Sequence, residues 1–300
     1  MSKISLVFHP AGAAGFRTPH MEQIFHESFV FADYDPGQRY CKQSTVFVVG
    51  VLDRKDWVML LIDQGYKVVV DNLPEVPMAA LPGSWHLTNA NWFWYNESFW
   101  YRRLGYQQYQ PGRTYQLLAF MPINRVDSTR DQLVTELEPL LTDCIWSYRQ
   151  HPLPMDLAAT DPLWQRYFNP AWYDSTCFSF VVESQYTGRE FVTEKSFKPI
   201  AFQHPFVIFG KPGAVTALKQ RGFETYENLF DENYDRAVDA QERTRLLINT
   251  IKDFKKQPHD AVTLAKIQHN HQRFFDQVLV THRIQQEIIN PILEYANTAL

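Results

Sequence analysis

The segment from Phe178 to Gly210 constrains the fold of this chain more than any other. Its first apolar run, Phe178–Val182, has the length of a buried strand and ends at Glu183. A polar turn follows, and Thr193-Glu194-Lys195 then begins a helix-like stretch that leads to a second apolar run at Pro205–Gly210. The order of strand, loop, helix and strand predicts a parallel βαβ unit.

The start of that predicted helix carries the residue types that bind a sugar nucleotide. Free N–H groups and the helix dipole attract phosphate to a helix N-terminus. Lys195 adds a positive charge for a phosphate oxygen, and Glu194 offers two acceptors for a pair of ribose hydroxyls. We therefore expect Thr193, Glu194 and Lys195 to bind the donor of a sugar-transfer reaction. The alternative is an ordinary surface helix with solvated charges.

The string Phe191-Val192-Thr193-Glu194-Lys195, preceded by an apolar strand that ends in Glu183, resembles the donor-site region of α-1,3-fucosyltransferases and related GT-B glycosyltransferases. The wider pattern also resembles small glycosyltransferase-like proteins encoded by phages. Two positions differ from the family pattern. Phe191 stands where the family usually has Tyr, and Ser184 stands where it usually has Asn.

A second match lies upstream, where Phe120–Asn124 followed by Ser128-Thr129-Arg130-Asp131 resembles the strand, loop and arginine that begin the C-terminal domain of this family. The resemblance implies that Arg130 contacts the donor diphosphate, for which its planar fork is suited. Arg189 is a second cation near the same turn, with a role at the phosphates and a solvated loop position as equal alternatives. Glu183 is expected either to orient the loop or to hold the ribose.

Predicted strands and helices alternate along the chain. Strands are expected at Ile4–Phe8, Thr45–Val51, Tyr66–Val70, Tyr115–Met121 and Cys144–Tyr148, and helices at 53–64, 91–104, 127–141, 214–221, 235–255 and 261–289, with Pro291 bending or ending the last. This alternation predicts an α/β fold with parallel sheets. With the resemblance, it implies a GT-B fold: two Rossmann-like lobes with an interdomain cleft and a C-terminal helical extension.

The best candidate for the link between the lobes contains Pro111-Gly112. We therefore expect an N-terminal, acceptor-side Rossmann-like lobe at residues 1–112. The C-terminal lobe at 113–300 is expected to bind the nucleotide sugar and to carry the terminal helices. A terminal helix that crosses back to the first lobe would fit the GT-B architecture.

Sugar transfer by direct displacement needs a carboxylate that takes the proton of the acceptor and cations that hold the leaving phosphate. Asp71 ends a predicted strand, and ligands of such sheets bind beyond the carboxyl ends of the strands. Glu97, within Tyr95-Asn96-Glu97-Ser98, is the other candidate for the base. The alternatives are a turn cap for Asp71 and a solvated helix face for Glu97.

No metal site is predicted. Asp33-Tyr34-Asp35 spells the DxD of metal-dependent transferases, but Pro36-Gly37 follows and no convincing strand precedes it, so a turn is expected. The donor, a UDP- or GDP-sugar, would be a co-substrate, and no further cofactor is expected. Glu183 and Glu190 are seven apart, whereas retaining GT-B enzymes commonly show two Glu eight apart. Together with the fucosyltransferase resemblance, this spacing favours inversion.

The composition suits a globular protein of 300 residues with 45% hydrophobic residues and a net charge of −4. Such a charge disfavours a broad basic surface for nucleic acid but leaves room for a local basic cleft. The three cysteines form no CxxC pair, which favours a reduced, cytoplasmic protein, in the host cytoplasm if the source is viral. No apolar run reaches the length of a membrane span, and no signal peptide is recognisable.

Aromatic residues gather in the segment 92–115, interleaved with Arg102, Arg103 and Arg113. Such a block can stack on bases or sugar rings, or it can form a core between the lobes. We predict an inverting hexosyl- or pentosyltransferase that moves a sugar from a nucleotide diphosphate sugar to a hydroxyl. The acceptor would be either a 5-hydroxymethylpyrimidine in DNA or a saccharide. The alternative is a non-catalytic carbohydrate-binding or structural protein on a transferase scaffold.

Overall fold

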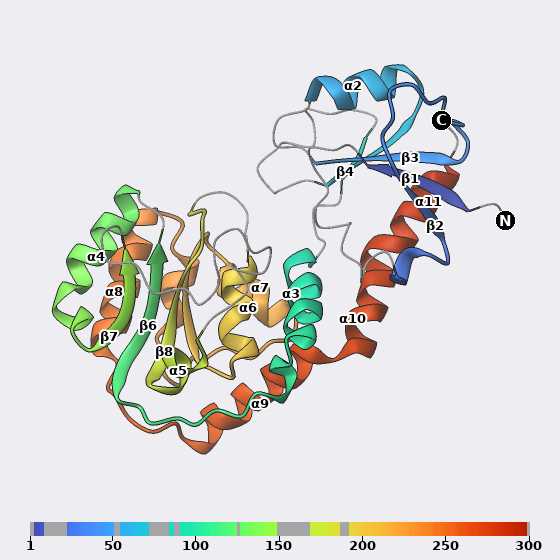
Figure 1. The fold of residues 1–300 in the computed structure, drawn as a ribbon. Helices are drawn as coiled ribbons and strands as arrows, with labels where there is room; N and C mark the ends of the chain where they lie inside the picture. Colours follow the sequence, from blue (N-terminus) through green and yellow to red (C-terminus); the bar gives the residue numbers. More distant parts are fainter. Residues whose placement is uncertain are drawn as a thin grey trace. The chain divides into compact units, whose positions relative to one another are not determined.

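The computed structural model describes residues 3–8, 23–50, 55–71, 84–86, 91–124, 127–148, 169–186 and 192–298. The chain divides into two compact units (Figure 1). The first unit comprises Met1–Asn96 and Asp276–Leu300, and the second comprises Glu97–Phe275. The division falls within helix α3 (Trp92–Arg103), whereas the sequence had suggested residue 112. The chain passes between the units a second time at Phe275–Asp276, and the terminal segment belongs to the first unit.

The first unit contains a five-stranded parallel sheet in the order β2-β1-β3-β4-β5. Its strands are β1 (Ile4–Phe8), β2 (Phe29–Asp33), β3 (Thr45–Gly50), β4 (Lys67–Asp71) and β5 (Trp85–His86). The predicted strands at Ile4–Phe8, Thr45–Val51 and Tyr66–Val70 are thus confirmed. Figure 1 shows α2 (Lys55–Asp63) and α11 (Asn290–Asn297) on opposite faces of this sheet.

Branched apolar side chains form the core between α2 and the sheet. Val58 and Leu61 of α2 pack with Val49 and Val70 of the neighbouring strands, and all four are at most 3% exposed. Valine is favoured here because its branched Cβ fits a pleated surface. Tyr34 and its aromatic neighbours close the edge of this core.

The C-terminal part of the chain, which passes from the second unit into the first, is not the single helix that the sequence suggested. The predicted helix 261–289 is wrong because Asp276 separates α9 (Ala261–Phe275) from α10 (Gln277–Ile284), accepting a hydrogen bond from the amide of Leu279 at 3.0 Å. A π-helical turn, Gln285–Ile289, then leads into α11. Pro291 lies in the first turn of α11, where a missing N–H is tolerated, so it does not end the helix.

A buried lysine fixes the end of α11. The ammonium of Lys67 donates hydrogen bonds to the carbonyl oxygens of Ala296 and Thr298, each at 2.5 Å. The last carbonyls of a helix have no partner within the helix, so Lys67 satisfies groups that would otherwise be stranded. This contact holds the start of β4 against the C-terminal helix, although the two lie far apart in the sequence.

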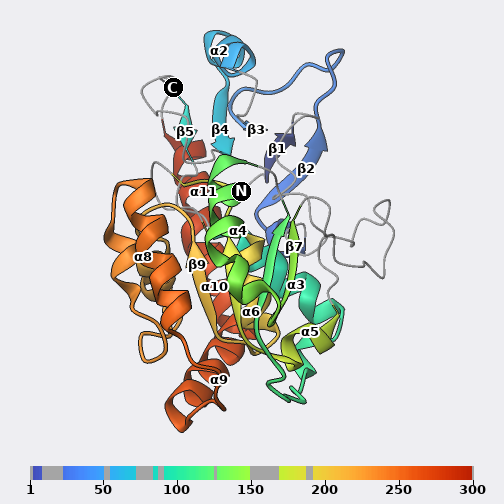
Figure 2. The ribbon, with the colours of Figure 1, turned by 90° about the vertical axis from the view of Figure 1, so that its left-hand side faces the viewer.

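The second unit contains a four-stranded parallel sheet in the order β7-β6-β8-β9. Its strands are β6 (Leu117–Asn124), β7 (Cys144–Tyr148), β8 (Thr176–Val182) and β9 (Phe206–Phe209). Helices α4 (Ser128–Leu141) and α8 (Ala240–Asp253) lie on one face, and α6 (Glu194–Ala201) lies on the other (Figures 1 and 2). Helices α5 (Pro170–Asp174), α7 (Ala214–Gln220) and α9, with most of α3, also belong to this unit. The predicted α/β class with parallel sheets is confirmed.

Two buried histidines lie near the beginning of β8. His204 contacts the Ser179 hydroxyl at 2.8 Å through Nδ1 and the Thr176 carbonyl at 2.9 Å through Nε2. His259 contacts the Tyr115 hydroxyl and the Cys177 carbonyl. Burial, and then the positive charge of Arg113, lower the pKa of His204 well below its usual value and that of His259 to about 4. Both rings are therefore neutral at pH 7.

From the two neutral, buried histidines we predict that the folded protein loses stability in acid. In the unfolded chain they titrate near pH 6.5, so between pH 6.5 and 4 the unfolded state binds more protons than the folded state. Stability should therefore fall as the pH falls through this window, by at most about 1.4 kcal/mol per pH unit for each ring. Urea unfolding of His259→Gln should show a shallower dependence on pH between 6.5 and 5 than the parent protein. The exposed His282→Gln serves as control and should keep the parent slope, and equal slopes in all three proteins would contradict the prediction.

Candidate functional site

The strand order of the second unit predicts a ligand-binding crevice at the carboxyl ends of β6 and β8. Helix α4 follows β6 on one face of the sheet, and α6 follows β8 on the other. The two loops therefore diverge from neighbouring strands, which is the point where ligands bind in open α/β sheets. The residues that follow these two strands include Asp127 and Arg130 after β6, and Glu183 and Ser184 after β8.

Glu183 caps the N-terminus of α6 from within the protein. Its side chain is 0% exposed. Oε1 accepts from the Thr193 amide at 2.9 Å and from the Ser196 hydroxyl at 2.7 Å, and Oε2 accepts from the Thr193 hydroxyl at 2.6 Å. Burial raises the pKa of Glu183, while the charge of Lys195 and these hydrogen bonds act in the opposite direction. Of the two roles predicted for Glu183, this geometry supports the orientation of the loop.

Thr193 begins α6 as its N-cap. Its hydroxyl accepts from the Lys195 amide at 3.4 Å and donates to Glu183, and its side chain is 2% exposed. Threonine is a preferred N-cap because its oxygen satisfies one of the free amides of the first turn. Thr193 thus fixes the direction in which the two following side chains leave the helix.

Glu194 and Lys195 are the side chains at this helix start that a ligand can reach, since they are 25% and 33% exposed. The ammonium of Lys195 lies 3.1 Å from Glu194 Oε1 and donates to the Ser184 hydroxyl at 3.1 Å. Burial alone would raise the pKa of Glu194, but the charges of Lys195 and Lys198 outweigh it and hold that pKa below its ordinary value. The site therefore presents an ionised acceptor beside a cation.

Arg130 joins the start of α4 to the end of β8. Its guanidinium pairs with Asp127 Oδ2 at 3.0 Å and donates to the carbonyls of Glu183 at 2.9 Å and Val182 at 3.4 Å. The side chain is 1% exposed. Asp127 is also the N-cap of α4, since its Oδ1 accepts from the Arg130 amide at 2.9 Å. Arg130 thus lies at the predicted crevice, and its contact with a diphosphate stays a prediction.

The loop after β8 is held by residues that the sequence interpretation did not single out. The Tyr186 hydroxyl donates to Asp127 Oδ2 at 3.2 Å, and its ring lies 5.0 Å from the ring of Phe209. Arg243 of α8, 1% exposed, donates to the carbonyls of Tyr186 and Gly210. A signal for Arg243 does exist in the sequence: it is in phase with the buried Leu247 and Ile251, where an arginine is unusual.

The two candidates for the catalytic base belong to different units. The backbone of Asp71 ends β4 and pairs with Gly50, but its side chain lies outside the described part of the structure, as do Arg189 and Phe191. Glu97 lies in α3 and is 2% exposed. The alternative that Glu97 occupies a solvated helix face is therefore wrong. The assignment of either residue as the base stays a prediction.

The DxD segment forms the expected turn, since the Gly37 amide donates to Asp35 Oδ1 at 2.8 Å. The expectation that no strand precedes it is wrong, because the apolar run Phe29–Ala32 lies in β2 at the edge of the sheet, and β2 ends at Asp33. Among the described residues, no group of three His, Cys, Asp or Glu is placed to hold a metal ion.

Part of the aromatic block contributes to the cores of the units. Trp94, Tyr95 and Tyr101 are 0% exposed. Tyr101 packs within the second unit, with its ring 6.3 Å from Phe202 and 6.2 Å from Phe274. These rings cannot stack on an acceptor while they are buried, which supports a core role for them.

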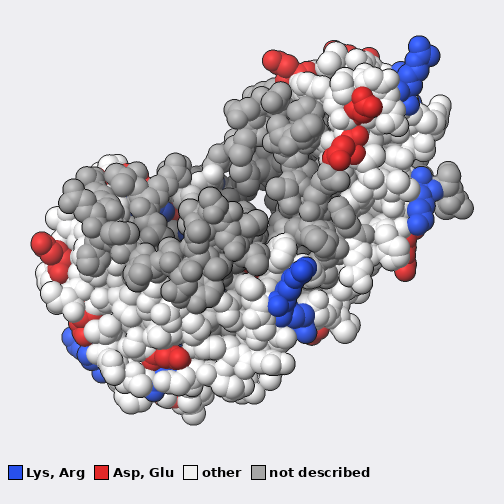
Figure 3. Space-filling view, in the orientation of Figure 1, with Lys and Arg blue, Asp and Glu red and all other residues white. Residues whose placement is uncertain are grey.

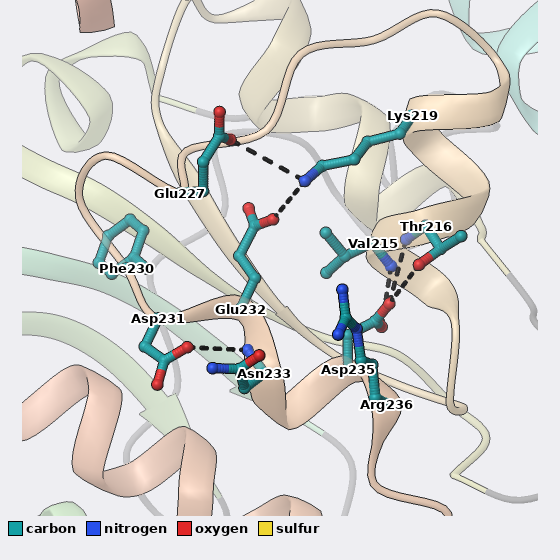
Figure 4. A pocket seen from close by; sticks show the side chains of 10 residues that line it. All are labelled: Val215, Thr216, Lys219, Glu227, Phe230, Asp231, Glu232, Asn233, Asp235 and Arg236. Carbon is teal, nitrogen blue, oxygen red and sulfur yellow. Dashed lines mark hydrogen bonds and ion pairs between the residues drawn. The ribbon is translucent and has the colours of Figure 1, made fainter.

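A separate pocket of about 260 Å³ lies beside α7 (Figure 4). It is lined by Val215, Thr216, Lys219, Glu227, Phe230, Asp231, Glu232, Asn233, Asp235 and Arg236. Lys219 pairs with Glu232 at 2.8 Å, and Asp235 accepts from the amides of Val215 and Thr216 at the start of α7. Because these charges satisfy one another and cap a helix, we assign the pocket no role in catalysis.

The fold is similar to that of an α1,3-fucosyltransferase. A crystal structure of α1,3-fucosyltransferase aligns with 94% of this chain and 89% of its own, with a TM-score of 0.52 and 10% sequence identity. Two further structures, of α1,3-fucosyltransferase with GDP-fucose and with GDP, align with TM-scores of 0.42 and 0.35 at 7% and 11% identity, covering 92% and 94% of this chain and 91% and 92% of theirs. No protein-family model matches the sequence. No curated protein matches it either.

We predict a large loss of stability when the buried capping side chain of Glu183 is truncated. Glu183→Ala leaves three donors without an acceptor and should lower the free energy of unfolding by about 2–4 kcal/mol. Glu183→Gln should cost less, because its carbonyl oxygen keeps the two contacts of Oε1. Urea denaturation at pH 7 measures both variants. The exposed Glu136→Ala on α4 is the control, expected within about 0.5 kcal/mol of the parent. A loss for Glu183→Ala no larger than that of the control would contradict the role of this cap.

Proposed function

We propose that the protein is a glycosyltransferase whose nucleotide-sugar donor binds at the start of α6. The observation that carries the proposal is the placement of Lys195 and Glu194, a cation and an ionised acceptor, both partly exposed at the start of the helix that follows β8. The fold shared with an α1,3-fucosyltransferase supports a GT-B arrangement for this chemistry.

The helix start suits a diphosphate for a reason of charge. During sugar transfer the bond between the sugar and the phosphate oxygen breaks, and negative charge grows on the departing phosphate. A fixed cation and a helix N-terminus stabilise that charge more than they stabilise the intact donor. Lys195 supplies the cation, and its attachment to the first turn of α6 sets its position in advance.

Glu194 and Arg130 complete the proposed donor site. The carboxylate of Glu194 accepts hydrogen bonds from ribose hydroxyls, since it has acceptor capacity beyond its contact with Lys195. The Nε atom of Arg130 makes no hydrogen bond to the described residues, although its other nitrogens do. We propose that this guanidinium contacts the diphosphate directly or, if it does not reach it, stabilises its negative charge from behind the residues that do.

The chemical step that we propose is an inverting displacement. Asp71 or Glu97 takes the proton of the acceptor hydroxyl, which attacks the anomeric carbon from the side opposite the phosphate. The acceptor is either a 5-hydroxymethylpyrimidine in DNA or a saccharide. On the face in Figure 3, the described Lys and Arg side chains are scattered and form no continuous patch, so an extended contact with DNA phosphates finds no support there. None of the described helices is long and apolar enough to cross a bilayer.

A panel of UDP- and GDP-sugars tests the proposal. Each donor is incubated with hydroxymethylated DNA, unmodified DNA or mixed oligosaccharides, and the released nucleotide is measured. Release that depends on one acceptor class identifies both substrates. A protein that binds sugars without releasing nucleotide from any donor would instead be a binding module on a transferase scaffold, and the proposed reaction would be wrong.

Loss of the cation should affect catalysis far more than stability. Lys195→Met keeps the length of the side chain and removes its charge, and kcat/KM should fall about 10²–10³-fold because a fixed group that stabilises the leaving phosphate is lost. The free energy of unfolding should change little, since Lys195 is partly exposed. Lys252→Met, at an exposed position on α8, is the matched control and should keep full activity. Unchanged turnover and donor affinity in Lys195→Met would contradict the proposed donor site.

A further inference from the structure

Arg243 is a buried cation whose hydrogen bonds to the described residues all go to backbone carbonyls. Its Nε donates to Gly210 at 3.0 Å, its Nη1 donates to Ala237 at 2.6 Å and to Val238 at 3.2 Å, and its Nη2 donates to Tyr186. No carboxylate in the described ranges lies at ion-pair distance from it. The side chain is 1% exposed; carbonyl oxygens contact its charge directly, and the carboxylates of Asp235 and Asp239 favour that charge from a greater distance.

The carbonyls that Arg243 binds belong to three separate loops. Tyr186 follows β8, Gly210 follows β9, and Ala237 and Val238 follow the short helix Glu232–Arg236. The planar guanidinium spans them because its donors point in fixed, divergent directions, which a lysine ammonium cannot reproduce. A buried charge is weak evidence for stability, because its desolvation opposes the gain from its contacts. We therefore looked for a geometric role in what these loops carry.

The loop after β8 leads from Arg243 to the donor site. The carbonyl of Tyr186 accepts from Arg243, its hydroxyl donates to Asp127, and its ring lies near the ring of Phe209 and the guanidinium of Arg130. Two residues earlier in the chain, the Ser184 hydroxyl accepts from the ammonium of Lys195 at 3.1 Å. Arg243 thus fixes a segment of three residues whose first member contacts the cation of the proposed site.

We propose that Arg243 is a positioning residue for the donor site: by holding the carbonyl of Tyr186, it places the Ser184 hydroxyl where it directs the ammonium of Lys195 toward the donor phosphate. This inference rests on the proposed function, because it takes Lys195 as the phosphate-binding cation. Arg243 itself touches neither donor nor acceptor. Its effect reaches Lys195 only through the loop. Loss of the Arg243 guanidinium and loss of the Ser184 hydroxyl should therefore have effects that do not add.

The test combines Arg243→Lys and Ser184→Ala, singly and together. UDP and GDP affinities are measured by calorimetry on folded protein, and kcat and KM are measured with the active donor. Each single variant should weaken nucleotide binding or kcat about tenfold, since small misplacements of a catalytic group are costly, while KM for the acceptor stays unchanged. The double variant should bind nucleotide and turn over no less well than the more impaired of the two single variants, because both changes interrupt the same chain of contacts.

Arg273→Lys is the matched control. The guanidinium of Arg273 also donates a hydrogen bond to a backbone carbonyl, that of Arg221. Arg273 lies in α9 of the same unit, away from the loop after β8. This variant should keep the parent affinity for nucleotide. A purely structural role for Arg243 would give a lower free energy of unfolding with parent affinity in the folded protein, and an effect additive to that of Ser184→Ala.

The outcomes separate this inference from the proposed function. If the parent protein binds neither UDP nor GDP, both fail. If Lys195→Met loses binding but Arg243→Lys and Ser184→Ala do not, only the positioning role fails. Should Arg243→Lys not fold, Ser184→Ala decides alone: Ser184 is only partly buried, and parent-like nucleotide binding in this variant overturns the inference.

Discussion

The second unit depends on one interaction, the capping of α6 by the buried carboxylate of Glu183. Strand β8 ends where this carboxylate can reach the amide and hydroxyl of Thr193 and the hydroxyl of Ser196. A charged group in the interior is tolerated only when donors surround it, and here the donors are the free groups of a helix start. The end of a strand and the start of the next helix are thereby fixed to each other, and the side chains that follow inherit that position.

At this end of the sheet, buried residues fix the backbone and partly exposed residues are available to a ligand. Glu183, Arg130 and Arg243 lie at 0–1% exposure and bind backbone groups or the helix cap. Glu194 and Lys195 keep a quarter to a third of their surface open. A site built in this way has its charges in place before a ligand arrives, and such preorganisation is the main source of electrostatic stabilisation in enzymes. The arrangement explains why residues that never meet the substrate can matter to it.

The sequence predicted the parts of this arrangement that are encoded locally. Apolar runs located β1, β3, β4 and β7–β9, and a threonine and an aspartate announced the starts of α6 and α4. The inward direction of Glu97 could not be predicted locally, because its burial is decided by elements that pack from elsewhere in the chain, whereas that of Arg243 is indicated by its helical phase with Leu247 and Ile251. Arg130 illustrates both cases: its neighbourhood was predicted from a motif, whereas its carbonyl partners at Val182 and Glu183 lie some fifty positions away.

The return of the terminal segment to the first unit has a consequence for biosynthesis. Residues 97–275 are continuous, so the second unit has every element it needs as soon as that stretch leaves the ribosome. The first unit does not, because Lys67 finds its carbonyl partners 229 and 231 positions later. Domains fold as units during synthesis once they are whole. The unit whose synthesis begins first is therefore completed last, and a nascent chain must carry the five-stranded sheet without its terminal helices while the second unit is already whole.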